Sequence, residues 1–476
     1  MVSAILRLNS NNFNPGFFAY GQFPLYLSFF TAVKHEALNV RLTLRFWSAV
    51  YSSLTVFLFY LIGQKILESK KIAFIFALLT IFTPGLIQSA HFGTTESILI
   101  FVFTLNIYLS FLIFKHPEKK KLLLLSGLIS GIGIATKISA LIFLVPFCFS
   151  FLFLFIRPSP KKTSKKNLNL ILKFSFLILT TALFSIIFSP FNLIGFPDFI
   201  SAMKYEIGVA TGAIPVFYTR QFMNTLPYLF QFQKIFPYTE GLFIFIFSFL
   251  GLGFIVKKSL QKHQTNPYLL ITLFSGLIYF LYQGQLFTKW TRFMSPIFFI
   301  APLLSLFFIK EIANKFLQKL FILLAILPGI YFFINTYLFP DVRIQATQWI
   351  NQNIPKNSTV LSETGNVVNL PLYDSKINVN HFDFYALDAD QSDRKLKDLI
   401  NKSDYIFIPS RRVFKSQNNS SFPLSQNYYQ QLFSGQLEFF QIKTFSKSNS
   451  LLLNPENAEE TWSIFDNPVI RIYQKQ

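Results

Sequence analysis

Ten apolar segments follow one another between residues 47 and 338, and they constrain the fold more than any other feature of this sequence. They lie at approximately 47–66, 72–89, 97–114, 122–136, 138–156, 174–190, 238–256, 267–283, 293–309 and 320–338. A helix needs about 20 largely apolar residues to cross a membrane. With 52% hydrophobic residues and 63 Phe in 476 positions, the chain is far more apolar than a soluble protein. The sequence therefore predicts an α-helical polytopic membrane protein.

Lys and Arg are distributed unevenly among the connections between these segments. Residues 1–339 contain 29 of the 43 Lys and Arg but only 8 of the 22 Asp and Glu. The connections on one predicted side of the membrane contain 19 Lys and Arg, and those on the other side contain 6. Because cytoplasmic loops are enriched in these residues, the first set is predicted to be cytoplasmic. The net charge of +21 is therefore attributed to membrane topology, and no nucleic-acid partner is expected.

The two ends of the chain are predicted to lie outside the membrane. Residues 1–46 are aromatic and form an extracytoplasmic loop, with a short interfacial helix that starts at Pro24. Because a loop on this side needs a preceding helix to translocate it, we expect a signal-anchor helix upstream of Met1. Residues 47–339 form the membrane domain.

Residues 340–476 have the composition of a soluble protein, with 14 acidic and 14 basic residues. Helical and strand patterns alternate there, which indicates a small extracytoplasmic α/β domain. Helices are predicted at 344–353, 394–401 and 428–433, and strands at 358–363, 405–409 and 469–473.

One acidic residue, Glu96, stands at the entrance to an apolar segment, in a connection that contains no Lys or Arg. A carboxylate at that depth carries a desolvation cost and is a candidate functional group. Cations end other segments on the same face. They are Lys137, after the short segment 122–136, Arg220, in the long aromatic connection 191–236, and Lys289 with Arg292, before the segment 293–309. Lys137 is equally consistent with a side chain that reaches the headgroups, and so are Lys289 and Arg292.

This pattern suits the transfer of a group from a lipid phosphate. The cations would neutralise the departing phosphate, and a carboxylate would accept the proton of the acceptor hydroxyl. His91, Tyr20, Tyr218 and Tyr228 are further candidates for substrate contacts on this face.

Motifs of soluble enzymes are missing from the sequence, including phosphate-binding glycine loops and zinc-binding HExxH. The five histidines have no metal-ligand spacing, and the single Cys148 excludes an intramolecular disulfide. No cofactor is therefore predicted with certainty, and a divalent cation beside His91 and Glu96 is left open.

The chain resembles the polytopic GT-C glycosyltransferases, in particular the protein mannosyltransferase and aminoarabinose-transferase branch. Residues 14–26 resemble the "NPxFFxYxxxPxY" stretch of that family's first outer loop, and 135–137 resemble the "ATK" that ends a short helix. Further similarity, in the family's order, lies at 45–49, 91–96, 227–230, 292–296 and 349–355.

The resemblance implies a plasma-membrane enzyme that takes a sugar from a polyprenyl-phosphate donor. It implies that Lys137 contacts the donor phosphate and that Glu96 occupies the family's second acidic site. The family's principal base, an Asp before the "NPxFF" stretch, would fall upstream of Met1. The acceptor, a lipid, glycan or protein, lies outside the cytoplasm.

Other functions remain open at this point. A transporter or flippase of lipid-linked glycans is the main alternative, although internal repeats and charges near the bilayer midplane are typical of transporters and are not evident here. A degenerate, non-catalytic member of the family is the second, and a structural subunit whose outer domain binds a partner is the third.

Overall fold

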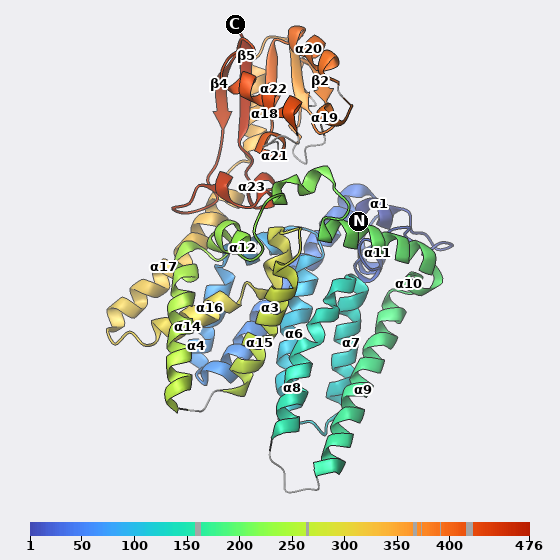
Figure 1. The fold of residues 1–476 in the computed structure, drawn as a ribbon, viewed down its shortest axis with the longest axis vertical. Coiled ribbons are helices and arrows are strands. Elements are labelled where there is room, and N and C mark those ends of the chain that lie inside the picture. Colours follow the sequence, from blue (N-terminus) through green and yellow to red (C-terminus); the bar gives the residue numbers. More distant parts are fainter. Residues whose placement is uncertain (158–162, 263–265, 365–368, 373, 391, 416–421) are drawn as a thin grey trace. The chain divides into compact units, whose positions relative to one another are not determined.

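The computed structural model describes residues 1–157, 163–262, 266–364, 369–372, 374–390, 392–415 and 422–476. The chain divides into two compact units. The first consists of Met1–Ile214 and Thr239–Gly329, and the second consists of Pro215–Tyr238 and Ile330–Gln476. The first unit is helical and the second contains the only sheet among the described residues (Figure 1).

Each of the ten predicted apolar segments is helical. In order they correspond to α3 (Ala37–Leu67), the pair α4 (Lys70–Ile81) and α5 (Pro84–His91), α6 (Glu96–Lys115), α7 (Lys120–Thr136), η1 (Ile138–Leu144) with α8 (Val145–Ile156), α9 (Thr163–Phe188), α14 (Leu242–Lys262), α15 (Pro267–Gly284), the pair η3 (Thr291–Ile297) and α16 (Ile300–Ile309), and α17 (Lys315–Phe333).

Seven helices in the described residues are long and apolar enough to cross a membrane, or nine if each bent pair is one span. The pair α4 and α5 bends by 61°, and the pair η3 and α16 bends by 53°. The helix α7, with 17 residues, is shorter than these spans. The predicted fold class, a polytopic helical membrane protein with a small C-terminal α/β part, is confirmed.

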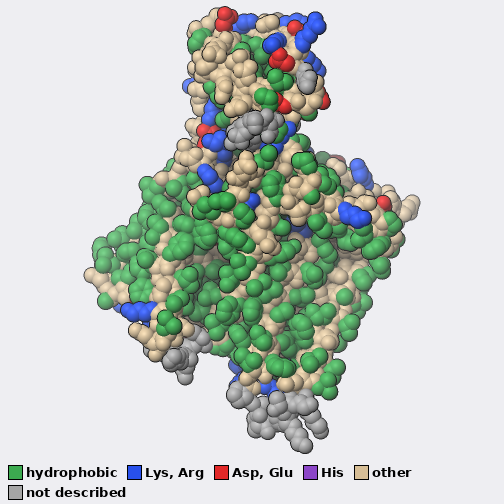
Figure 2. Space-filling model, viewed as in Figure 1, with side chains coloured by type: hydrophobic (Ala, Val, Ile, Leu, Met, Phe, Trp, Pro, Cys, Tyr) green, Lys and Arg blue, Asp and Glu red, His purple; other side chains and the backbone are tan. Residues whose placement is uncertain are grey.

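Apolar side chains are spread over much of the visible surface of the helical unit (Figure 2). The helix α6 is the exception, since 72% of its most apolar window is buried inside the protein. It packs against α3, α7, α8 and η3. The amide nitrogen of Asn106 on α6 donates to Ser130 Oγ (3.1 Å) and to the carbonyl of Phe143 (3.0 Å). Such hydrogen bonds between helices fix their positions, so α6 is the central helix of this unit.

The predicted outer connections are largely helical as well. The predicted interfacial helix is α2 (Phe23–Thr31), which follows a short α1 (Val2–Leu6). The long connection after α9 folds into α10 (Phe191–Ile194) and α11 (Phe196–Thr211) in the first unit. It continues in the second unit as η2 (Phe217–Phe222), α12 (Leu229–Lys234) and α13 (Phe236–Thr239).

The sheet of the second unit has five strands in the order β2-β1-β3-β5-β4. They are β1 (Thr359–Glu363), β2 (Asn378–Phe382), β3 (Tyr405–Ile408), β4 (Phe439–Phe445) and β5 (Ile470–Lys475). The first three strands are mutually parallel, and β5 pairs antiparallel with both β3 and β4. Three of these strands are predicted by the sequence, while the edge strands β2 and β4 are not.

Helices cover both faces of this sheet. On β3, Tyr405 and Phe407 pack with Ile350 of α18 (Val342–Asn353), whereas Ile406 and Ile408 pack on the opposite face. That second face is covered by α20 (Asp393–Asn401) and α22 (Pro423–Phe433). Because side chains alternate along a strand, an apolar run such as 405–408 supplies both cores. Shorter helices complete the unit: η4 (Ile334–Leu338), α19 (Leu387–Asp390), α21 (Arg412–Lys415), η5 (Pro455–Asn457) and α23 (Glu460–Ile464).

Candidate functional site

The predicted acidic residue, Glu96, opens the central helix α6 and is 4% exposed. Its Oε2 has no hydrogen-bond partner among the described residues. A buried carboxylate oxygen without a donor is costly. Two contributions lower this cost. The helix N-terminus carries a partial positive charge, and the ammonium of Lys137 lies within its electrostatic range.

Lys137 lies at the break between α7 and η1, where its backbone is extended (φ −159°, ψ 129°). Its ammonium lies 4.3 Å from the centre of the Phe293 ring and 5.8 Å from that of Tyr20. The charges that act on it most come from Glu96, Arg292 and Glu206. Four predicted site residues, Glu96, Lys137, Arg292 and Tyr20, are thus brought together.

The close approach of Gly21 to α7 explains why Tyr20 lies there. The Gly21 amide donates to the carbonyl of Thr136 (2.9 Å). A Cβ at position 21 would stand 2.0 Å from the carbonyl oxygen of Ala135, so only glycine permits this contact. The residues on either side of this contact, Tyr20 and Lys137, consequently face one another.

Gln22 attaches the same segment to the end of α9. It is fully buried, and its amide nitrogen in the backbone donates to Ser189 Oγ (3.0 Å). Its side chain donates to Asn192 Oδ1 (3.2 Å) and accepts from the backbone of Phe191 (3.0 Å). These bonds fix the start of α10 and hence the position of α11, which carries Glu206.

Arg292 lies on η3, with its guanidinium carbon 5.4 Å from the ring centres of both Trp290 and Phe293. It donates a hydrogen bond to the Tyr20 hydroxyl. Burial raises the pKa of Tyr20, so the phenol is neutral at physiological pH. The hydroxyl of Tyr279 donates to the Phe293 carbonyl (2.6 Å) and anchors η3 on α15.

A further carboxylate, Glu206 on α11, belongs to the same cluster and has no assigned role at the sequence level. Its side chain is accessible from the surface but partly desolvated by its neighbours, and its charge acts on both Lys137 and Tyr20. Burial raises the pKa of Glu206, while Lys137 and Arg292 act in the opposite sense. The sequence offers one sign that Glu206 is functional: acidic residues are scarce in this region, and it is one of only 8 before position 340. Which side of α11 faces Lys137 cannot be predicted from the sequence.

Two predicted residues of the first unit have other surroundings. Lys289 is 2% exposed, and its ammonium donates to the Phe287 carbonyl two residues away (2.9 Å). His91 ends α5 with its ring 5.7 Å from that of Phe92, and the charge of Arg45 acts on its imidazole. Their roles in substrate or phosphate binding stay predictions.

The remaining three predicted residues, Tyr218, Arg220 and Tyr228, belong to the second unit. Arg220 donates to the Tyr385 carbonyl (3.2 Å), and its guanidinium lies 3.8 Å from the centre of the Phe422 ring. The ring of Tyr218 lies beside that of Phe217, and Tyr228 precedes α12 with a positive φ of 64°. Their part in the same site as Glu96 also stays a prediction. In the described part of the chain, no three His, Cys, Asp or Glu side chains form a group able to hold a metal ion.

Comparison with known proteins gives one family and several solved structures. Residues 17–206 match the model of the dolichyl-phosphate-mannose-protein mannosyltransferases. No protein of curated function matches the chain. The fold is similar to that of the archaeal oligosaccharyltransferase AglB from Archaeoglobus fulgidus, in complex with an inhibitory peptide and a dolichol-phosphate, with 13% identity and a TM-score of 0.46. That match covers 86% of this chain and 64% of AglB, so the chain spans less than two thirds of its length.

A second solved structure is ArnT from Cupriavidus metallidurans bound to undecaprenyl phosphate, with 11% identity and a TM-score of 0.44. It aligns over 96% of this chain and 88% of its own. The family match contains Tyr20, Glu96, Lys137 and Glu206, four of the five clustered residues. The family match supports the predicted resemblance to the protein mannosyltransferases over residues 17–206.

Proposed function

We propose that this protein transfers a sugar from a polyprenyl-phosphate donor to an acceptor outside the cytoplasm. The observation that carries the proposal is the cluster of Lys137 and Arg292 with Glu96, Glu206 and Tyr20, because it combines cations for a phosphate with carboxylates for a proton. The family that matches residues 17–206 is named for a dolichyl-phosphate-mannose donor, which is the same chemical class.

The reaction breaks the bond between the sugar C1 and a phosphate oxygen and forms a bond from C1 to the acceptor oxygen. The polyprenyl phosphate leaves with one more negative charge than it had in the donor. Lys137 and Arg292 are assigned to stabilise that charge. Because Phe293 packs beside both cations and Trp290 packs beside Arg292, water is displaced and the electrostatic attraction is strengthened.

The two carboxylates are assigned different roles because their surroundings differ. Glu96 is buried, so it orients Lys137 from the protein side. Glu206 is exposed and is available to the acceptor, from whose hydroxyl it would take the proton. A carboxylate with a raised pKa is a better general base near neutral pH. Tyr20 holds Arg292 in place through its hydroxyl.

The topology of the proposal follows the distribution of Lys and Arg. The site faces the side with few of these residues, so transfer takes place outside the plasma membrane and the C-terminal α/β unit is extracytoplasmic. Tyr218, Arg220 and Tyr228, in the second unit, are proposed to contact substrate from that side, together with His91 and Lys289 of the first unit.

The proposal is tested with the purified full-length protein in nanodiscs and radiolabelled polyprenyl-phosphate sugars, with and without a chelator of divalent cations. Glu96→Gln and Lys137→Ala are expected to lower transfer at least tenfold each, with folding intact by size-exclusion chromatography. Lys34→Ala, at an exposed lysine in the same unit, is the control. Full activity in both site variants would exclude this cluster as the transfer site.

A further inference from the structure

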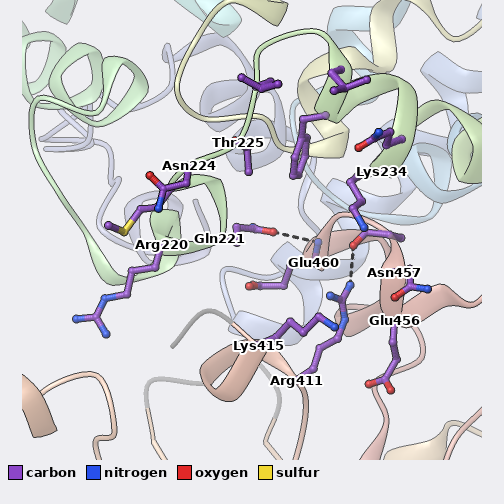
Figure 3. A pocket seen from close by; sticks show the side chains of 16 residues that line it. Arg220, Gln221, Asn224, Thr225, Lys234, Arg411, Lys415, Glu456, Asn457 and Glu460 are labelled. Carbon is purple, nitrogen blue, oxygen red and sulfur yellow. Dashed lines mark hydrogen bonds between the residues drawn. The ribbon is translucent and has the colours of Figure 1, made fainter. Parts of the chain in front are cut away.

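The second unit contains a cavity of about 480 Å³, and Arg220 is the only one of its lining residues to which the proposed function gives a role (Figure 3). Its walls come from the segment 220–234 and from three short stretches of the C-terminal part, around 411–415, 456–458 and Glu460. A volume of this size lies within the range of about 300–1,000 Å³ found for small-molecule sites.

Cations line the cavity: Arg220, Lys234, Arg411 and Lys415. Two acidic residues also line it, but each is bound to an arginine that does not. Glu456 pairs with Arg471 (2.7 Å), and Glu460 pairs with Arg412 (3.1 Å). The charges of Glu456 and Glu460 are therefore largely neutralised by arginines outside the cavity. The lining is left with an excess of positive charge.

Lys234 is the clearest sign of this excess. The charges that act on it most are those of Lys415 and Arg411, and both are positive. Burial and these two cations lower the pKa of Lys234. Like charges held at short range in a partly desolvated space repel one another, so a bound anion would relieve the repulsion.

Arg411 is a cation of the same lining that the protein holds in a fixed position. Its side chain is 6% exposed, and one terminal nitrogen donates to the Ala458 carbonyl (2.9 Å) and to Ser463 Oγ (3.2 Å). These bonds hold the guanidinium, which is always charged, in the lining of the cavity.

Hydrogen bonds join the segment 220–234 to the C-terminal part of the cavity wall before any ligand binds. The side chain of Gln221 donates to Glu459 Oε1 (2.9 Å) and accepts from the backbone of Glu460 (3.1 Å). The backbone of Glu459 donates to the Lys234 carbonyl (2.8 Å). These bonds hold both ends of the segment 220–234 against the C-terminal part, so the cavity is pre-formed.

The lining also has an apolar side. Met223, Leu226, Leu229 and Phe230 lie on the same segment as Lys234 and contribute to the wall. A simple inorganic anion would leave this side in contact with water, whereas a molecule with an apolar part next to its charged group would cover it.

We propose that this cavity binds the phosphate group of a phosphorylated molecule that also has an apolar portion. The phosphate would lie among Lys234, Lys415 and Arg411, and the apolar portion would lie along Leu226 and Leu229. The molecule is either a phospholipid headgroup or a phosphorylated glycan, which share this chemistry. The further inference that this molecule is the acceptor of the sugar rests on the proposed function. The inference that the cavity binds it does not.

Binding is measured with the full-length protein in a neutral detergent. The probes are glycerol 3-phosphate, glucose 1-phosphate, dioctanoyl phosphatidylglycerol and, as a lipid with a balanced headgroup charge, dioctanoyl phosphatidylcholine. The double variant Lys234→Gln/Lys415→Gln is expected to weaken binding of the anionic probes about tenfold or more. The control, Lys395→Gln/Lys402→Gln, loses two exposed charges of the same unit and should bind as the wild type does.

The probes also distinguish the two sources of the phosphate. Tighter binding of phosphatidylglycerol than of both sugar-sized phosphates assigns a lipid headgroup, and the reverse order assigns a phosphorylated glycan. If none of the anionic probes binds, or if the cavity and control variants bind equally well, the proposal is wrong. Lys137→Ala separates the two proposals: it should lower transfer, whereas the loss of binding caused by Lys234→Gln/Lys415→Gln should be the same with and without it.

Discussion

The ammonium of Lys137 lies 4.3 Å from the centre of the Phe293 ring, although the two residues are 156 positions apart in the sequence. At this distance the ring attracts the cation and holds it without neutralising its charge. A carboxylate in place of the ring would instead compete with a phosphate for the same ammonium. The contact therefore keeps Lys137 in position and leaves its charge for a substrate.

Replacing this ring tests that role. Phe293→Leu keeps an apolar side chain and removes the cation–π contact, so transfer should fall about three- to tenfold. Lys137→Ala should reduce it further, and the double variant should be no worse than Lys137→Ala alone. Phe316→Leu, at an exposed ring on α17, is the control and should leave kcat/KM unchanged. Additive losses in the double variant would mean that Phe293 acts independently of Lys137.

The contact between Gly21 and α7 gives a second prediction. In Gly21→Ala the new methyl group would overlap the Ala135 carbonyl oxygen, so the segment must move away and take Tyr20 with it. Transfer is expected to fall at least tenfold, with loss of the hydrogen bond between Tyr20 and Arg292. Initial rates with a polyprenyl-phosphate sugar would measure this, and unchanged rates would show that the position of Tyr20 is unimportant.

The role of Glu206 predicts a dependence on pH. Burial raises its pKa, so the carboxylate is lost on acidification at a higher pH than the ordinary Glu value of about 4.3. If the ionised form accepts the acceptor's proton, transfer should decrease as the pH falls through that raised value. Glu206→Gln should be slower at every pH and should lack this acidic limb. Asp198→Asn, at an exposed acid on the same helix, should retain it.

Helix packing supplies a prediction on stability with a control two residues away. A Cβ on Gly251 would lie 1.8 Å from the Leu304 carbonyl oxygen, whereas one on Gly253 would meet nothing within 4 Å. Gly251→Ala should therefore destabilise the packing of α14 on α16 by about 1–3 kcal/mol, as overpacking does. Gly253→Ala should be neutral. Thermal unfolding in detergent measures both, and equal melting temperatures would contradict the close packing.

The sequence predicts the membrane helices well because ten apolar segments leave few alternatives in a bilayer. The central strands β1, β3 and β5 are predicted for a related reason, since burial on both faces produces continuous apolar runs such as 405–408. The edge strands are not. In β2 only Phe382 is buried, and in β4 only Phe439, so neither has a pattern that burial imposes.

The candidate site is predictable only where a charge is unusual for its surroundings. Glu96 and Lys137 stand out because they interrupt apolar sequence. Glu206 does not stand out, because its connection also contains Asp198 and Lys204, and only the folded helix distinguishes them. Two further features depend on tertiary contacts that no local pattern encodes. They are the burial of Lys289, which bonds to the Phe287 carbonyl, and the location of Arg220 in the second unit.

The hydrogen bond between Gln22 and Asn192 spans 170 residues, and it has a consequence for biogenesis. At a synthesis rate of about 5–20 residues per second, roughly 10 to 30 s pass between the translation of these two residues. During that time the N-terminal segment cannot form its bonds to the end of α9. The cluster around Lys137 is therefore completed late, after at least five spans have been inserted. Nascent chains arrested earlier would lack it, and the cluster can be complete only after Arg292, the last of its five residues in the sequence, has been translated.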